Sequence, residues 1–234
     1  MNSDLRYARQ TILPEIGPEG QEKLRAASVL IVGAGGLGSP VALYLTAAGV
    51  GRIGLADPDT VSESNLQRQI LYDESQIGRP KVFAARQRLS ALSSHTRFDC
   101  YPQGISKQNA ERIVRDYDLA VDCCDSFAVR YLLDDACAAC GKPWIHGSIG
   151  QFHGQLAVLN YRSGRRYADL YPGQREALCA QAPASSGVLG AVPGIIGALQ
   201  AAEAVKLLVG FGRLLDGQLM TLDAKTMETA VFTF

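Results

Sequence analysis

The sequence predicts an α/β fold with a doubly wound, mostly parallel sheet and a C-terminal antiparallel extension. Short β-branched runs alternate with helical periodicity over the first two-thirds of the chain, which is typical of repeated βα units. A glycine-rich turn between the first apolar run and a small-residue helix indicates that the sheet is Rossmann-like. Beyond Gly150 the segments are short and strand-like, so we expect them to extend the same sheet within a single domain, residues 1–234.

The expected elements follow the chain in order. The parallel strands are expected at residues 28–33, 52–57, 97–101, 119–123 and 143–147. Helices are expected between them at residues 38–48, 80–92, 107–115 and 127–140. The later segments should form strands at 153–160, 218–223 and 229–234, with a buried helix at 190–208. Residues 162–186 have weak periodicity, and long segments of this kind are usually functional or mobile.

Composition excludes several classes of protein. The 234 residues are 47% hydrophobic and 20% charged, which is ordinary for a globular protein with a full core. Lysine plus arginine equals aspartate plus glutamate, at 23 each, so no bulk basic field favours nucleic acid or an anionic membrane. The N-terminus lacks a signal-peptide pattern and no uninterrupted apolar run is long enough to span a bilayer, so we expect a cytoplasmic protein. Six scattered cysteines do not predict a disulfide framework.

The glycine-rich turn, residues 33–38, predicts a nucleotide site. Backbone N–H groups and a helix N-terminus at such a turn bind phosphate, and the missing side chains let the phosphate approach closely. Asp57 follows at the end of the next apolar run, where an acidic residue usually accepts the ribose hydroxyls. These features fit a dinucleotide as well as a mononucleotide, so they identify the ligand class and leave the reaction open.

Three charged residues downstream favour a triphosphate. Arg68 and Lys81 would together clamp a polyanion whose charge shifts during group transfer. Asp125 follows the strand expected at 119–123 and should face the same nucleotide, because ligands of doubly wound folds lie beyond the carboxyl ends of the strands. A carboxylate there would hold Mg²⁺ against the phosphates. Taken singly, each cation is more often a solvated surface charge, and a strand-end Asp is often a helix N-cap.

Further motifs occur in a fixed order along the chain. They are Arg6-Tyr7-Ala8-Arg9-Gln10, the Gly-Gly-Leu-Gly turn, Asp57-Pro58-Asp59, Ser64-Asn65-Leu66-Gln67-Arg68-Gln69, Gly78-Arg79-Pro80-Lys81, Asp122-Cys123-Cys124-Asp125 and Gly187-Val188-Leu189-Gly190-Ala191-Val192-Pro193-Gly194. With these motifs in this order, the chain resembles the ThiF/MoeB/HesA family, the bacterial relatives of ubiquitin-activating enzymes. The resemblance extends from about Arg6 to about Asp223.

The resemblance implies an adenylation domain that uses ATP and Mg²⁺. Its substrate would be the C-terminal Gly-Gly carboxylate of a ubiquitin-like sulfur-carrier protein of the ThiS or MoaD type, which is adenylated with release of pyrophosphate. Sulfur transfer, from a donor such as a cysteine desulfurase, would then give a thiocarboxylate for thiamine or molybdopterin biosynthesis. The family likeness also implies a homodimer, and nothing in it implies a nucleic acid or a membrane as partner.

The resemblance also assigns roles to individual residues. Arg9 would reach the site of the other subunit, and Asp125 would hold the metal. The remaining residues would bind the nucleotide. Gly35 and Gly36 would line the phosphates, Asp57 would bind the ribose, and the phosphates would be contacted by Asn65, Arg68 and Lys81.

The chain departs from the family pattern at its cysteines. Relatives commonly carry two Cys-x-x-Cys pairs that bind zinc, but residues 165–172 contain no cysteine at the first position, so no structural zinc site is expected. Cys137 and Cys140 form a Cys-x-x-Cys on a helix, where we expect core packing. Cys179 is either a reactive nucleophile in an arginine-flanked loop or an incidental thiol. Ser126 replaces the asparagine usual after the metal aspartate.

Two other functions stay open at this point. A nicotinamide-dependent oxidoreductase is compatible with the glycines and Asp57, but Arg68 and Lys81 are not needed for hydride transfer. A zinc-free descendant that binds nucleotide or carrier without transferring sulfur is the other alternative, because the zinc cysteines are missing.

Overall fold

A single mixed sheet organises the protein, whose computed structural model describes residues 3–181 and 187–234. Its eight strands lie in the order β3-β2-β1-β4-β5-β6-β7-β8. Five are parallel: β1 (Ser28–Val32), β2 (Arg52–Ala56), β3 (Arg97–Tyr101), β4 (Leu119–Asp122) and β5 (Trp144–Gly150). Three continue the sheet in antiparallel pairing: β6 (His153–Leu159), β7 (Gln218–Asp223) and β8 (Glu228–Thr233). The predicted doubly wound sheet with an antiparallel extension is therefore confirmed.

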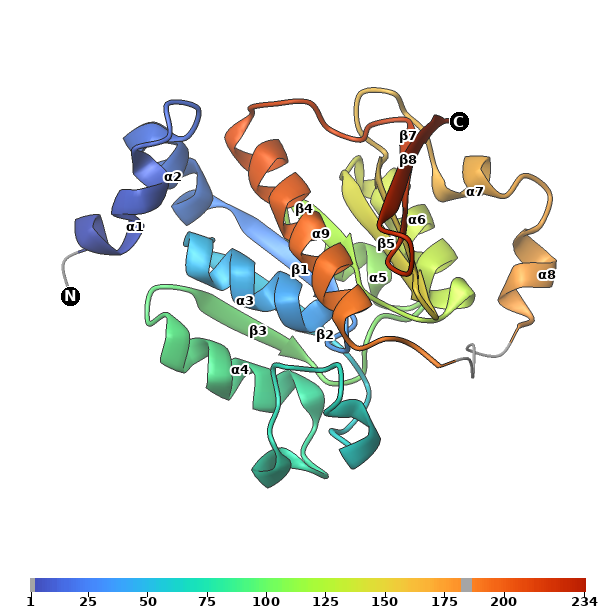
Figure 1. Cartoon of the computed structure of the whole chain (residues 1–234), viewed down its shortest axis with the longest axis horizontal. Helices are drawn as coiled ribbons and strands as arrows, with labels where there is room; N and C mark the ends of the chain where they lie inside the picture. The colour runs from blue at the N-terminus through green and yellow to red at the C-terminus, as the bar shows by residue number, and fades with distance from the viewer. Residues whose placement is uncertain (1–2, 182–186) are drawn as a thin grey trace.

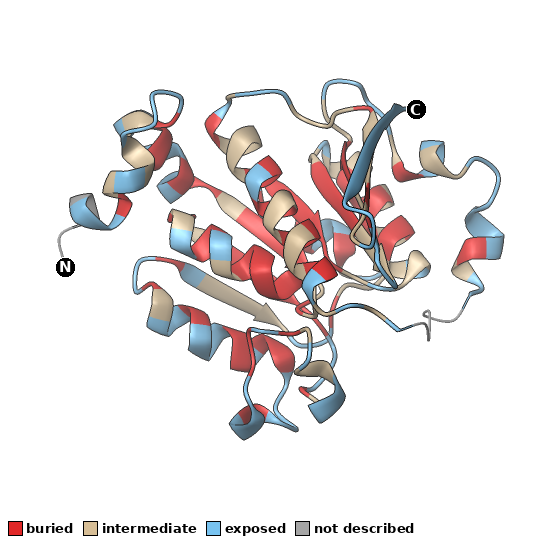
Figure 2. Cartoon of the chain, viewed as in Figure 1, coloured by how far each residue is buried: buried red, intermediate tan, exposed pale blue. Residues whose placement is uncertain are grey.

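Helices cover both faces of this sheet (Figure 1). On one face lie α3 (Gly38–Ala48), α4 (Lys81–Leu92) and α9 (Ala191–Val209), and on the other lie α5 (Ala110–Arg115) and α6 (Phe127–Cys140). Alternate residues of β1 enter the two cores, Val29 and Ile31 on the α3–α9 side and Leu30 and Val32 on the α5–α6 side. Figure 2 shows the central strands buried and the edge strand β8 exposed.

Most element boundaries fall within one to three residues of the predicted ones. The largest differences are at β5, which continues to Gly150, and α5, which begins at Ala110. His146 lies inside this longer strand. Two short 3₁₀ helices, η1 (Glu63–Asn65) and η2 (Glu74–Gln76), connect β2 to α4.

Two N-terminal helices, α1 (Ser3–Thr11) and α2 (Gly17–Ala26), were not predicted from the sequence. Both have a low apolar content and depend on contacts with the rest of the protein. Gln10 Nε2 donates to Gln21 Oε1 at 2.8 Å and to the carbonyl of Ala48 at 3.1 Å, which ties α1 to α2 and to the end of α3.

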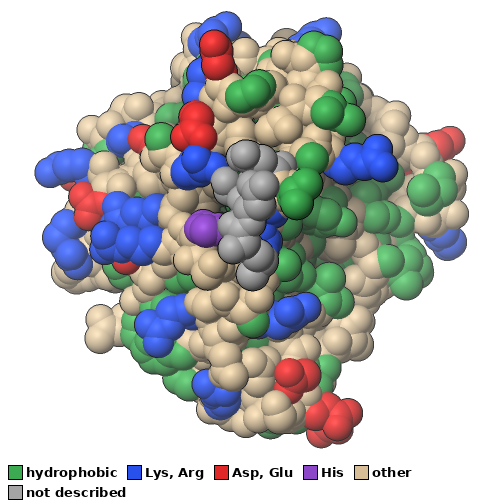
Figure 3. All heavy atoms as spheres, turned by 90° about the vertical axis from the view of Figure 1, so that its left-hand side faces the viewer, with side chains coloured by type: hydrophobic (Ala, Val, Ile, Leu, Met, Phe, Trp, Pro, Cys, Tyr) green, Lys and Arg blue, Asp and Glu red, His purple; other side chains and the backbone are tan. Residues whose placement is uncertain are grey.

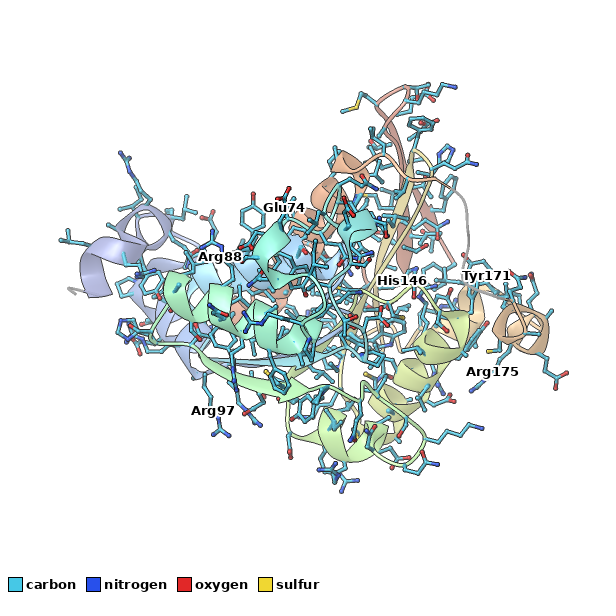
Figure 4. The ribbon with its side chains drawn as sticks, turned by 90° about the horizontal axis from the view of Figure 1, so that it is seen from below. Glu74, Arg88, Arg97, His146, Tyr171 and Arg175 are labelled. Carbon is cyan, nitrogen blue, oxygen red and sulfur yellow. The ribbon has the colours of Figure 1, made fainter. Side chains whose placement is uncertain are left out.

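The weakly periodic segment contains two short helices, α7 (Tyr167–Leu170) and α8 (Arg175–Cys179), while residues 182–186 lie outside the described part. Arg166 binds both Asp134 (2.9 Å) and Asp135 (2.8 Å) of α6, and Arg175 pairs with Asp135. Figure 4 shows Tyr171 and Arg175 beside α6. Ionic contacts to a core helix therefore hold a segment that has little apolar periodicity of its own.

The helix α9 is long and apolar enough, by length and composition, to cross a membrane. Half of that stretch is buried inside the protein, against α3 and the sheet. Glu203 of this helix accepts from the backbone N–H of Leu215 at 3.0 Å, in the interior of the molecule. Its packing is that of a core helix.

We predict that Gly197→Ala destabilises the contact between α3 and α9. A Cβ at this position would lie 2.7 Å from the carbonyl oxygen of Leu37 and would collide with the ring of Pro40. Overpacking of this kind lowers the free energy of unfolding by about 1–3 kcal/mol. Gly194→Ala is the matched control, because its Cβ would meet nothing within 4 Å, and it should stabilise the helix by about 0.5–1 kcal/mol. Urea unfolding measures both, and equal effects would contradict the packing argument.

Candidate nucleotide-binding site

A cavity of about 590 Å³ lies at the carboxyl ends of β1, β2, β4 and β5. The strand order reverses between β1 and β4, and this is where doubly wound sheets bind their ligands. Its volume is in the range of small-molecule sites. Six of the residues assigned from the sequence line it: Gly35, Gly36, Asp57, Arg68, Lys81 and Asp125.

The glycine turn is fixed by close backbone packing and two side chains. Gly33 has a φ of 96°, and a Cβ there would collide with the carbonyl of Cys123. Asp57 Oδ2 accepts from the backbone N–H of Ala34 at 2.7 Å, and the Tyr72 hydroxyl donates to the Ala34 carbonyl at 2.7 Å. The turn is therefore preorganised before any ligand arrives.

Asp57 lies between the turn and the cavity. Its second oxygen, Oδ1, accepts from the backbone N–H of Asp59 at 2.8 Å. Burial raises the pKa of Asp57, and the Lys81 ammonium and the two backbone donors oppose this shift. Each carboxylate oxygen keeps a second lone pair, so the group can accept from a ribose hydroxyl while it holds the turn.

The two cations are both held by groups that a phosphate could replace. Lys81 is only 6% exposed, and its Nζ binds Asp59 Oδ2 at 2.8 Å. Asp59 itself is 66% exposed, so the ion pair lies at the cavity wall. Arg68 Nη1 donates to the carbonyl of Ser64 at 3.1 Å. The sequence placed Asp59 next to Asp57 but did not indicate that it pairs with Lys81.

Asp125 lies on the turn between β4 and α6 and is exposed to the cavity. Ser126, which follows it, accepts from the backbone N–H of Val129 at 3.4 Å and caps α6. Ser126 is therefore the N-cap of α6, and the Asp125 carboxylate does not cap this helix. Mg²⁺ typically binds one or two carboxylates together with substrate phosphates and water, so this donor set fits the metal.

A buried charge network supports this turn. Asp122 Oδ2 accepts from Arg130 Nε at 2.7 Å and lies 2.9 Å from His146 Nδ1. Arg130 Nη2 also donates to the carbonyl of Cys124 at 2.8 Å. Burial opposes ionisation of Asp122, but the Arg130 guanidinium and the His146 hydrogen bond outweigh it and lower the pKa to about 2. Burial lowers the pKa of His146, so this imidazole is neutral at pH 7. Figure 4 shows His146 toward the middle of the sheet.

Arg130 was not predicted from the sequence to be part of this network. An arginine among apolar residues at the start of α6, eight positions after a strand-end aspartate, is a signal for a buried ion pair. Arg130 also lines the cavity.

Three predicted site residues are not brought into the cavity of this chain. Asn65 lies in η1, where its Oδ1 accepts from the backbone N–H of Ser62 at 3.4 Å. Arg9 is exposed on α1. Cys179 ends α8 and is partly buried, and Gln181, two residues later, lines the cavity. The expected arginine-flanked loop around Cys179 is helical, and Arg175 of this helix pairs with Asp135.

The cysteines do not form a metal cluster in the described ranges 3–181 and 187–234. No group there of three or more His, Cys, Asp or Glu residues could hold a metal ion. Cys137 is buried and Cys140 donates to the carbonyl of Glu111 at 3.4 Å, which is the packing expected for this pair. The residues therefore do not fit a tetrahedral thiolate site.

Comparison with known proteins gives the family. Residues 7–234 match the ThiF family. The chain belongs to this family. A sulfur carrier protein adenylyltransferase of Thermus thermophilus is 47% identical over 224 residues, which are 94% of this chain and 83% of that protein. Adenylyltransferase and sulfurtransferase MOCS3 of Drosophila yakuba is 47% identical over 226 residues, and this ThiF-family chain spans 50% of its length.

Solved structures support the fold. The crystal structure of E. coli MccB with ATP has a TM-score of 0.83 at 21% identity and covers 97% of this chain and 71% of that one. The structure of PaaA has the same TM-score at 21% identity, covering 99% of this chain and 73% of that one. At this level of identity the likeness concerns the ThiF-family fold alone.

We predict that Asp122→Asn lowers the free energy of unfolding at pH 7 by about 3–5 kcal/mol, because it leaves the buried Arg130 unpaired. The pKa of Asp122 is lowered in the folded state, so its contribution is present above its ordinary value near 3.8 and is lost as the pH falls through about 2. The difference between the variant and the wild type should shrink between these pH values. Urea unfolding as a function of pH measures it. Asp116→Asn, at an exposed position, is the control, and a difference that does not change with pH would contradict the assignment.

Proposed function

We propose that this protein is an ATP-dependent adenylyltransferase that activates the C-terminal Gly-Gly carboxylate of a ubiquitin-like sulfur-carrier protein. One observation carries the proposal: a single cavity at the switch point of the sheet combines a preorganised glycine turn, two cations and an exposed carboxylate. The Thermus relative bears the name of this activity and is similar over most of both chains.

In this reaction a carboxylate oxygen of the carrier attacks the α-phosphorus of ATP. The new bond gives an acyl-adenylate, and the bond to the β-phosphate breaks with release of pyrophosphate. The attacking carboxylate carries no proton, so the enzyme needs no general base. Its task is to compensate charge and to position the reactants.

The cavity residues match that task. Asp57 would accept the ribose hydroxyls, Gly35 and Gly36 would lie along the phosphates, and Arg68 and Lys81 would exchange their present partners for phosphate oxygens. Mg²⁺ held by Asp125 would neutralise the charge that develops on the departing pyrophosphate. Asn65 Oδ1 accepts from the backbone N–H of Ser62, and its amide N–H groups would donate to the phosphates.

The adenylate would then receive sulfur from a donor such as a cysteine desulfurase, giving a thiocarboxylate for thiamine or molybdopterin biosynthesis. The choice between these pathways depends on the carrier-facing surface. We expect a cytoplasmic enzyme. Cys179, two residues before the cavity-lining Gln181, is the candidate thiol.

A homodimer would complete the site with Arg9 of the second subunit. The faces of α3 and α9 that point away from the sheet are apolar, with Tyr44 58% exposed and Leu43, Ile195 and Leu199 only partly buried. Exposed apolar surface of this kind is typical of subunit interfaces. Figure 3 views the molecule from the side of α1 and α2, where hydrophobic side chains lie among lysine and arginine side chains.

A second candidate is a descendant that binds nucleotide or carrier but no longer transfers sulfur. The absence of a thiolate cluster from the described residues favours it. It predicts pyrophosphate exchange in Asp125→Ala equal to that of the parent protein, whereas the proposed enzyme requires a large loss.

We predict ATP–pyrophosphate exchange that depends on a Gly-Gly-ending carrier. Lys81→Met should lower kcat/KM by about 10²–10³, because a buried cation that stabilises developing charge is removed. Lys107→Met, at an exposed position outside the cavity, should leave the rate unchanged. Absence of exchange together with tight binding of a nicotinamide coenzyme would overturn the proposal in favour of an oxidoreductase.

We predict that Arg9→Ala and Asp125→Ala are each inactive and that co-expression of the two restores activity. In a mixed dimer one site receives Asp125 from one subunit and Arg9 from the other. Random pairing of equal amounts makes half of the dimers mixed, so about a quarter of the wild-type exchange rate should return. A rate no higher than the sum of the two separate variants would contradict the shared site.

A further inference from the structure

Gln69 is a buried side chain that the proposed mechanism does not use. It follows Arg68 between η1 and α4, is 4% exposed and lines the nucleotide cavity. Its Oε1 is shielded from solvent and has no hydrogen-bond partner within residues 3–181 and 187–234. Its Nε2 lies over the glycine turn, 3.4 Å from the position that a Cβ on Gly35 would occupy.

Other buried glutamines of this protein are held by hydrogen bonds. Gln21 is also 4% exposed, and its Oε1 accepts from Gln10 while its Nε2 donates to the carbonyl of Ala48 at 3.0 Å. Gln200 is fully buried, and its Nε2 donates to the carbonyl of Asp122 at 2.6 Å. Buried polar groups are nearly always satisfied. Gln69 departs from this rule, because no protein donor in the described residues holds its amide oxygen, so its amide is not fixed in the way that those of Gln21 and Gln200 are.

We propose that Gln69 is a nucleotide-binding residue whose amide N–H donates to a phosphate oxygen of ATP. This inference rests on the proposed function, because it requires a nucleotide with its phosphates over the glycine turn. Phosphate oxygens accept hydrogen bonds, and the N–H groups of Gln69 are donors on the cavity wall beside the glycine turn. No N–H or O–H donor of the described residues holds the amide oxygen, so the amide can turn toward the ligand without breaking a hydrogen bond at that atom.

A neutral hydrogen-bond donor and the two cations interact with phosphate over different distances. Arg68 and Lys81 attract the triphosphate at long range, whereas an amide acts only at hydrogen-bond distance and adds no charge. It therefore sets where the phosphates lie along the turn. A glutamate of the same size at this position would place a negative charge against the phosphates.

The test uses the unfolding temperature of the full chain with and without Mg·ATP. Gln69→Met removes the amide at similar volume. Without nucleotide, the unfolding temperature should stay the same or rise, because an unsatisfied polar group is lost. The dissociation constant for Mg·ATP, from the nucleotide-dependent shift, should rise about tenfold. Gln69→Glu should weaken binding further, by about a hundredfold, through repulsion.

Gln21→Met is the matched control, since it is equally buried and lies away from the cavity. It should lower the unfolding temperature of the free protein and leave the dissociation constant unchanged. The inference is overturned if Gln69→Met binds Mg·ATP like the wild type, or if it destabilises the free protein as much as Gln21→Met does. If the wild type itself shows no Mg·ATP-dependent shift, the proposed function fails, whatever the variants do.

Discussion

The buried ion pair between Asp122 and Arg130 is the constraint on which the site depends. Asp122 ends β4, and Arg130 comes from the first turns of α6, so the pair fixes the turn between them and with it the cavity wall that carries Asp125. Arg130 also reaches Tyr167 of α7 at 3.4 Å, and Gln200 of α9 binds the Asp122 carbonyl. Helices from both faces of the sheet therefore meet at Asp122, α6 through its carboxylate and α9 through its backbone carbonyl.

The second feature of the site is that its buried charges, Asp57 and Lys81, have partners in the absence of ligand. Asp57 holds the glycine turn, and Asp59 holds Lys81, whose ammonium also acts on Asp57. In the proposed reaction a phosphate would compete with Asp59 for Lys81 and with the Ser64 carbonyl for Arg68. Asp59 is largely exposed, so its release into water costs little. Asp57 is held by two backbone N–H groups that do not involve Lys81, so the glycine turn would keep its shape if Lys81 moved to a ligand.

The fold and much of the site could be predicted because both follow from local patterns. Alternating periodicity gives the strands and helices, and the rule that ligands lie at strand carboxyl ends places Asp57 and Asp125 in one cavity. The pairs Asp122–Arg130 and Lys81–Asp59 could not be derived, because a side-chain partner depends on which helix packs where. The N-terminal helices were missed because their few apolar residues leave them dependent on contacts such as Gln10 with Gln21.

Thiol chemistry in this chain is restricted by burial. Burial raises the pKa of four of the six thiols: Cys100, Cys123, Cys124 and Cys137. A raised pKa keeps a thiol protonated at neutral pH and removes its nucleophilicity. Cys140 donates to a carbonyl of α5 and does not line the cavity. Cys179 is the thiol whose helix leads, within two residues, to the cavity wall at Gln181. Adenylation itself needs no protein nucleophile, because the attacking group is the carboxylate of the substrate, so the proposed activation step requires none of these thiols.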